Sequence, residues 1–213
     1  KTNYESISSH NLGMDFQYRI NTNSKLTFSV NPDFGQVESD PADVNLTAYE
    51  TYFQEKRTFF MEDIDIFSTP LEIFYSRRIG EKSWGQGMMV YEDTLRADDY
   101  DTLYYDIPEI IKGAAKIAGK TESGLSYGIL GAITTQNDSS NFLELIQKGK
   151  NSNYFVSRLK QDLLGGNSFV GLMTTSSMKD SSHTASMDGM LNLLDNQISI
   201  NTQMLLGQNN GEK

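Results

Sequence analysis

The sequence contains no cysteine among its 213 residues. This absence excludes disulfide bonds, cysteine zinc sites and cysteine nucleophiles together. It is common in bacterial envelope proteins but does not by itself fix a compartment.

Long apolar runs are also missing, because no stretch reaches the roughly 18 apolar residues that a membrane-spanning helix needs. Hydrophobic residues make up 38% of the chain, and the mean hydropathy is -0.47. These values exclude a helical membrane protein. They remain compatible with a transmembrane β-barrel, whose strands alternate lipid-facing apolar residues with lumen-facing polar residues and so keep an average hydropathy like that of a soluble protein.

Positive charge is scarce as well. The net charge is -10 and the isoelectric point is near 4.6. No basic arm or cluster is visible in the sequence. Binding to nucleic acid requires clustered Lys and Arg that neutralise phosphates, so a nucleic acid partner is not expected.

The sequence does contain a period-two alternation of apolar and polar residues, which is typical of strands with one wet face. It begins in residues 12–21 and resumes after a turn at residues 22–24, and the two segments predict a hairpin. It is clearest after Asp195 and Asn196, where the polar face carries almost no charge. The apolar faces consist of Met14, Phe16, Tyr18 and Ile20, of Leu26, Phe28 and Val30, and of Ile198, Ile200, Met204 and Leu206.

Further hairpins are expected between residues 113 and 177, and residues 71–79 also have a strand-like composition. Residues 81–109 are first rich in Gly and then strongly acidic, which predicts a long loop. We count about eight strands, joined mostly by short turns at one end and longer loops at the other. That asymmetry is typical of outer-membrane barrels.

Residues 31–67 interrupt the alternation. Asp40 suits a helix N-cap, Pro41 suits the first helical position, and Tyr49 and Phe53 share one side of the expected helix. We expect a short helix and loop at about residues 40–66 that act as a luminal or barrel-end plug, with Tyr49 and Phe53 buried against strands.

The predicted fold is therefore an all-β, antiparallel, up-and-down transmembrane β-barrel. We expect residues 1–213 to form a single domain that is a fragment of a longer chain and a partial barrel, with residues 31–67 inserted. The apolar faces of the first and last hairpins carry almost no charge, as lipid contact requires. A soluble β-sandwich core would impose the same segregation, so this alternative stays open.

Six charged residues form the candidate ligand-binding or plug-locking cluster, because both signs of charge occur close to the expected plug. Charged side chains in a lumen more commonly lock a plug to the wall than bind a ligand. Paired carboxylates, such as Glu62 with Asp65, are also the groups that a glycosidase uses. With 28 acidic residues such pairs arise easily, and no catalytic residue is assigned. The cluster consists of Glu50, Glu55, Lys56, Arg57, Arg77 and Arg78.

Metal and cofactor motifs are weak. Asp98, Asp99 and Asp101 could supply oxygen ligands to Ca²⁺, but they lack the EF-hand spacing and its glycine, and a solvated loop is the preferred interpretation. His10 and His183 are far apart in the sequence, although a triad through His183 is conceivable. No phosphate-binding glycine motif is present, so we expect no cofactor.

Three separated strings carry a resemblance to a known family. They are NPDFGQVESDPADVNLTAYETYFQEKRTFFMEDIDIF, LEIFYSRRIG and GAAKIAGKTESGLSYGIL, in that order. They resemble Bacteroidetes-type envelope proteins that join a carbohydrate-binding family 9-like domain to a domain of unknown function, number 5916, regarded as an outer-membrane β-barrel. The carbohydrate-binding domain is absent here. The family's PEKRPFF pattern is altered, because Gln54 and Thr58 stand where it has proline.

The resemblance implies a protein of the bacterial outer membrane whose partners are the lipid bilayer and a glycan or another envelope protein. Its expected role is the binding, uptake or docking of surface glycans or partner proteins. Two alternatives stay open at this point. One is a surface carbohydrate-active hydrolase that uses luminal carboxylates, and the other is a soluble periplasmic β-sandwich that serves as a binding module.

Overall fold

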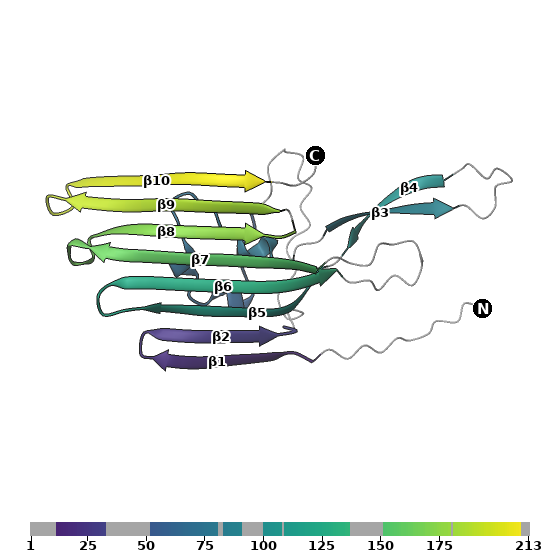
Figure 1. The fold of residues 1–213 in the computed structure, drawn as a ribbon, viewed down its shortest axis with the longest axis horizontal. Coiled ribbons are helices and arrows are strands. Elements are labelled where there is room, and N and C mark those ends of the chain that lie inside the picture. The colour runs from purple at the N-terminus through teal and green to yellow at the C-terminus, as the bar shows by residue number, and fades with distance from the viewer. Residues whose placement is uncertain are drawn as a thin grey trace.

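The structure is a computed structural model that describes residues 12–32, 52–80, 83–90, 100–107, 109–136, 151–179 and 181–209. Most of them form one antiparallel sheet of eight strands in the order β1-β2-β5-β6-β7-β8-β9-β10 (Figure 1). The prediction of an all-β, up-and-down antiparallel fold is therefore confirmed. The strands are β1 (Met14–Asn21), β2 (Ser24–Val30), β5 (Glu109–Lys120), β6 (Leu125–Gln136), β7 (Asn151–Leu163), β8 (Ser168–Ser177), β9 (Ser182–Leu193) and β10 (Ile198–Asn209).

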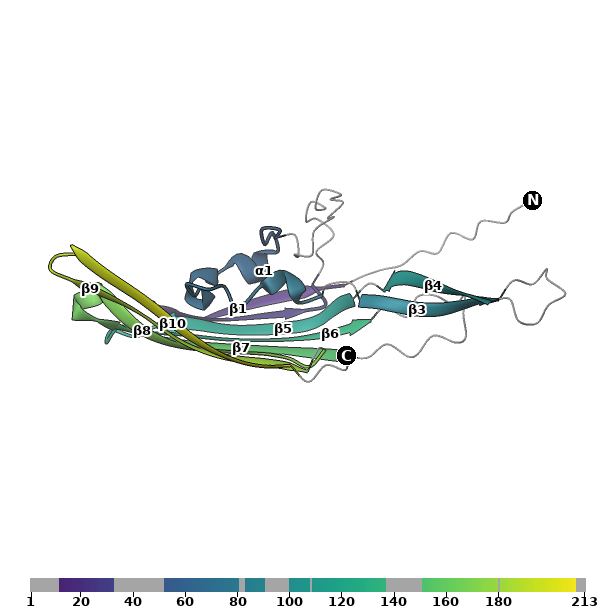
Figure 2. The ribbon, with the colours of Figure 1, turned by 90° about the horizontal axis from the view of Figure 1, so that it is seen from above.

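The sheet is open. β1 and β10 lie at its two edges, and within the described residues neither edge pairs with the other. Figure 2 shows that the sheet curves, so that it has a concave face and a convex face. These eight strands therefore form an open sheet, and the partial transmembrane barrel that we expected stays a prediction.

The connections differ in length between the two ends of the sheet. At one end β1 joins β2, β5 joins β6, β7 joins β8, and β9 joins β10 through short turns, in which Asp195 and Asn196 have positive φ angles of 51° and 66°. Asp and Asn tolerate this left-handed conformation better than most residues. At the other end the chain runs from β2 to β5 through residues 31–108, whereas β8 and β9 are joined by residues 178–181. The expected asymmetry holds except at this last connection.

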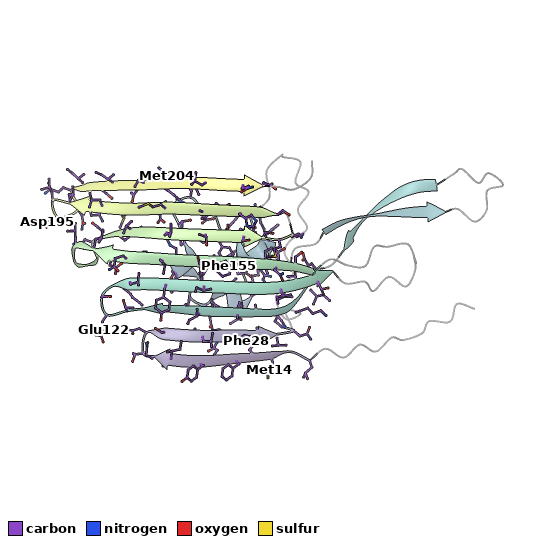
Figure 3. All side chains as sticks on the ribbon, in the orientation of Figure 1. Met14, Phe28, Glu122, Phe155, Asp195 and Met204 are labelled. Atoms are coloured by element: carbon purple, nitrogen blue, oxygen red, sulfur yellow. The ribbon has the colours of Figure 1, made fainter. Side chains whose placement is uncertain are left out.

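The two faces of the sheet have opposite character. The convex face exposes large apolar side chains, among them Phe155 at 46% and Met204 at 69% exposure. Figure 3 labels such residues on β1, β2, β7 and β10. The concave face instead buries Lys116, Arg158 and Asp188, which are at most 2% exposed. The convex face thus exposes large apolar residues, while the concave face buries charged ones.

An inner segment, residues 52–80, covers part of the concave face (Figure 2). It contains α1 (Thr58–Met61) and two short 3-10 helices, η1 (Ile64–Phe67) and η2 (Ser76–Arg78). None of the described helices is both long and apolar enough to span a membrane. The buried core lies between this segment and the sheet, with Phe59, Phe60, Phe67 and Ile79 on one side and Ile111, Leu130, Val156 and Met173 on the other.

The helix expected from Asp40, with Tyr49 on its buried side, lies in residues 33–51, outside the described part of the chain. Phe53 is described and is half-buried. Over residues 52–66 the chain is irregular apart from α1 and the start of η1.

The strand expected at residues 71–79 is wrong. These residues are irregular and end in η2. Side chains, rather than a neighbouring strand, satisfy the backbone here: Arg57 donates to the carbonyls of Ser76 and Ile79 at 2.7 and 2.6 Å. The backbone N–H of Leu71 donates to Gln203 at 2.6 Å. Ile73, Phe74 and Ile79 of this stretch pack in or against the core without strand pairing, whereas Leu71 is exposed.

The long loop expected at residues 81–109 is also wrong. Its described parts form a separate hairpin of β3 (Ser83–Val90) and β4 (Tyr100–Ile107), beyond the end of the main sheet (Figure 1). Gly85 pairs with Tyr105 and Gly87 with Leu103. Because glycine has no side chain, Gly85 and Gly87 interrupt the alternation that would mark a strand in the sequence.

Candidate functional site

A buried ion pair between Glu55 and Arg57 connects the two ends of the inner segment. Their exposed fractions are 7% and 8%. The Arg57 guanidinium donates to both carboxylate oxygens of Glu55, at 2.8 and 2.7 Å, and Ser76 donates its hydroxyl to the same carboxylate at 2.5 Å. Together with the carbonyls of Ser76 and Ile79, these contacts join the start of the segment to its end.

Glu55 is a buried carboxylate held in its charged form. Burial alone would raise its pKa, but the hydrogen bonds and charge of Arg57 and the hydroxyl of Ser76 outweigh this effect and lower the pKa below its ordinary value. A carboxylate in this state accepts hydrogen bonds and does not donate a proton.

The predicted charge cluster is only partly assembled. Glu55 and Arg57 are brought together, whereas Glu50 lies outside the described residues. Lys56 is half-buried and donates its backbone N–H to Glu55 at 3.1 Å. Arg77 and Arg78 follow Ser76 in η2 with Arg78 exposed, and in the described contacts it is Ser76 that reaches Glu55.

Lys116 of β5 attaches α1 to the sheet. Its ammonium donates to the carbonyl of Phe59 at 2.6 Å and also to the carbonyl of Glu62, and it lies 5.1 Å from the centre of the Phe59 ring. The last carbonyls of a helix have no partner within the helix, and a cation is favoured there. A single lysine among alanines on the buried face of a strand is the sequence signal for this contact.

A second contact joins the inner segment to the hairpin of β1 and β2. Lys25 binds the carboxylates of Glu62 and Asp63 at 2.9 and 3.2 Å. Gln17 donates to both oxygens of Glu62 at 3.1 Å. The hydrogen bond from Lys25 is the main reason that the pKa of Glu62 lies below its ordinary value. Partial burial acts in the opposite direction.

Acid should weaken this contact. A carboxylate with a lowered pKa stabilises the folded state above its unfolded pKa, near 4.3, and this contribution is lost as the pH falls through the lower folded value. We expect Glu62→Gln to cost up to about 1 kcal/mol at neutral pH, since the pair is partly exposed. The difference from the wild type should be smaller at about pH 3, below the unfolded pKa, because the contribution of this carboxylate is lost as it becomes protonated. Urea unfolding at the two pH values measures this, with Asp65→Asn as the exposed control.

A buried ion pair between Arg158 and Asp188 spans β8. Arg158 of β7 and Asp188 of β9 are each 1% exposed. Their side chains form two charge-assisted hydrogen bonds, one of 2.7 Å from Nη2 to Oδ2. Gly171 of β8 lies between them, and a Cβ at this position would be 2.5 Å from Nη2 of Arg158. The absence of a side chain at residue 171 therefore makes room for the guanidinium.

Gly128 of β6 likewise makes room for a side chain, in this case one from the inner segment. A Cβ at this position would lie 2.7 Å from Cζ of Phe67 and 2.8 Å from Cγ2 of Ile66. The Phe67 ring therefore packs directly on the backbone of the sheet. The glycine thus allows η1 to lie close to β6, because a larger residue at position 128 would push the Phe67 ring away from the sheet.

The other candidates from the sequence are not assembled into sites in the described residues. His183 Nδ1 lies 2.9 Å from the Ser176 hydroxyl, but no described carboxylate binds this imidazole. His10, Asp98 and Asp99 fall outside the described residues, and the side chain of Asp101 is not described. Nowhere in the described part of the chain do three or more metal-binding side chains of the His, Cys, Asp or Glu type gather.

Comparison with known protein families matches residues 1–210 to a domain of unknown function, DUF5916. Neither the curated proteins nor the solved structures contain a match to the chain. The resemblance carried by the three sequence strings is thus confirmed at the level of the family, while its association with Bacteroidetes and with a carbohydrate-binding domain stays a prediction. Because the match covers nearly the whole sequence, the chain belongs to the DUF5916 family.

Proposed function

We propose that this chain forms part of the wall of an outer-membrane β-barrel, with the inner segment as its luminal plug. One observation carries the proposal: the convex face exposes its apolar residues, while the concave face buries Lys116, Arg158 and Asp188 beneath or beside the inner segment. A soluble protein gains stability by the reverse arrangement. Lipid on the convex side makes the observed arrangement favourable.

The length of the apolar rows agrees with this role. Along β10, apolar or Thr residues alternate from Ile198 to Leu206, and Gln208 follows on the same face. A transmembrane strand needs about 9 to 11 tilted residues to cross the hydrocarbon layer. The β-sandwich alternative would require a second sheet over the convex face, and the described second sheet is the hairpin of β3 and β4.

The barrel that we propose has more strands than the main sheet. A closed barrel of about eight strands has an interior just wide enough for its own side chains. Here the interior side must also accommodate the inner segment with its buried Phe59, Phe60 and Phe67. Further strands next to β1 and β10 would give the wall the necessary circumference and would pair the two open edges.

The plug would govern what passes through or docks at this wall. Lys25 and Lys116, which lie outside the predicted charge cluster, hold it to the wall, and the Glu55–Arg57 pair of that cluster holds the plug together. The family resemblance extends the proposal to surface glycans as the cargo or docking partner. A hydrolase gains no support from Glu55 and Glu62, because a general acid needs a raised pKa and the pKa values of these two carboxyl groups are lowered.

Matched charge insertions on β10 test the proposal. Ile200 is 51% exposed on the convex face, and its neighbour Asn201 points to the concave side. We expect Ile200→Arg to cost about 2 to 4 kcal/mol of folding free energy in lipid vesicles, while Asn201→Arg costs little. Denaturant titrations of the two variants in vesicles measure this difference.

The location of the protein in the cell is a second test of the proposal. The wild-type protein should fractionate with outer membranes, require detergent for extraction and migrate differently on gels before and after heating. Equal costs for the two arginine variants, or recovery of the protein in the soluble fraction, would contradict the membrane role.

A further inference from the structure

The inner segment contacts both edges of the open sheet. At one edge Glu62 accepts hydrogen bonds from Gln17 of β1 at 3.1 Å and from Lys25 of β2 at 2.9 Å. At the other edge Gln203 of β10 is bonded to Leu71. Residues 62–71 therefore connect the first two strands of the sheet order to the last one, across the concave side (Figure 2).

The contact at β10 resembles a strand pairing that is made by a side chain. The backbone N–H of Leu71 donates to Oε1 of Gln203 at 2.6 Å, and Nε2 of Gln203 donates to the Leu71 carbonyl at 3.3 Å. Nε2 also donates to the hydroxyl oxygen of Ser186 on β9, at 3.2 Å. A carboxamide carries the same kinds of donor and acceptor as a peptide group. One side chain therefore ties the backbone of the inner segment to the edge strand.

These contacts lie near one row of paired residues that crosses all the strands of the main sheet. Lys25 belongs to this row, Gln203 is bonded to its member Ser186, and the Phe67 ring packs on its member Gly128 in the middle of the sheet. A segment that is tied near both edges and rests on the centre favours a sheet that is concave toward it, which is the curvature in Figure 2. The row consists of Arg19, Lys25, Ala118, Gly128, Arg158, Met173, Ser186 and Leu205.

The length of the connection agrees with this effect. Six strand spacings separate β2 from β10 in the sheet order, which is about 29 Å in a flat sheet. Residues 62–71 include η1, a 3-10 helix with a rise of about 2 Å per residue, and can extend to only about 27 Å. The connection is therefore no longer than a flat sheet is wide between the two ties. A sheet that curves toward the inner segment shortens the distance that has to be crossed.

We propose that the inner segment is a transverse brace that sets the curvature of the sheet, with the bonds between Leu71 and Gln203 as its tie to the β10 edge. The brace acts on the sheet itself, so this inference does not depend on membrane insertion. Its consequence for the barrel rests on the proposed function: the width of a barrel is linked to the number of strands that close it. The brace would then help to select the circumference of that barrel.

Pulsed electron paramagnetic resonance on the detergent-folded protein tests the brace. The sequence contains no cysteine, so spin labels at Arg19→Cys and Leu205→Cys report one distance, between the two ends of the row on the concave side. Gln203→Leu should lengthen this distance by more than half a strand spacing, about 2.5 Å, and broaden its distribution, because the β10 edge loses its tie. A Gly-Gly insertion after Ser68 leaves both ties in place but lengthens the connection, so it should lengthen the distance as well.

Asn201→Leu is the matched control. Asn201 lies on the concave side of the same strand, is exposed and makes no side-chain hydrogen bond within the described residues, so its replacement should leave the distance unchanged. An unchanged distance in Gln203→Leu and in the insertion variant would overturn the brace, and so would an equal lengthening by Asn201→Leu. If Gln203→Leu does not fold, the insertion variant alone decides. The membrane role is measured separately, by the arginine variants of Ile200 and Asn201 in vesicles.

Discussion

Replacement of Asp188 with alanine is expected to lower the free energy of unfolding by about 3 to 5 kcal/mol. The reason is the position of Arg158, which is 1% exposed and donates to both carboxylate oxygens of Asp188. Removal of the carboxylate leaves the guanidinium charged, buried and without that partner. A cation in such surroundings loses its hydration without compensation.

Urea titration followed by circular dichroism measures this loss, and Glu122→Ala in the exposed turn between β5 and β6 provides the control. The paired variant Arg158→Met with Asp188→Leu separates the charge effect from packing. It should recover most of the lost stability, because a buried ion pair exchanged for apolar residues of similar volume is often neutral or stabilising. If Asp188→Ala costs no more than Glu122→Ala, the pair does not stabilise the fold.

The strands could be predicted because their signal is local. Met14, Phe16 and Tyr18 alternate with polar residues, and the structure places them on one exposed face. Alternation also defined which face is apolar. It could not define which face is buried, since lipid contact and a sandwich core produce the same pattern. The buried face was identified only from the positions of the inner segment and of the buried Lys116 and Arg158 in the structure.

The contacts that hold the inner segment could not be predicted in the same way. Lys116 binds Phe59 and Glu62 across more than fifty residues of sequence, since its partners are 57 and 54 positions away. Arg158 and Asp188 are separated by a whole strand whose Gly171 makes their pairing possible. Such contacts depend on register and on the path of the chain over the sheet, and periodicity carries no information on either.

The fold explains part of the family's PEKRPFF pattern in physical terms. Thr58 is the first residue of α1, a position where proline is favoured because its missing N–H has no partner within the helix. Arg57 before it has φ -77° and ψ 117°, a conformation that a following proline also prefers. The departure from the PEKRPFF string at Thr58 is therefore compatible with the same local structure, and the matching Glu55, Arg57, Phe59 and Phe60 are the buried residues of this stretch.

Replacement of Phe67 with alanine should have a similarly large effect, about 3 to 5 kcal/mol, because the ring is 4% exposed and lies in the core between the inner segment and the sheet. Met61→Ala is the control, since that side chain is 48% exposed. Limited proteolysis within residues 52–80, together with urea titration, distinguishes release of the inner segment from unfolding of the sheet.

A double-mutant cycle with Gly128 tests whether Phe67 fixes the inner segment to the wall. Gly128→Ala alone should cost about 1 to 3 kcal/mol, because its Cβ would meet the Phe67 ring at 2.7 Å. With Phe67→Ala present, the same change should cost less, since the contact with the ring is gone and the contact with Ile66 Cγ2 at 2.8 Å remains. Gly131→Ala, whose Cβ would approach the Tyr154 carbonyl no closer than 3.9 Å, should be nearly silent in both backgrounds. Additive costs for Gly128→Ala and Phe67→Ala would show that the ring does not pack on β6. The docking of the inner segment would then depend on its other contacts with the sheet, which include those of Lys25 and Lys116 and the packing of Phe59, Phe60 and Ile79.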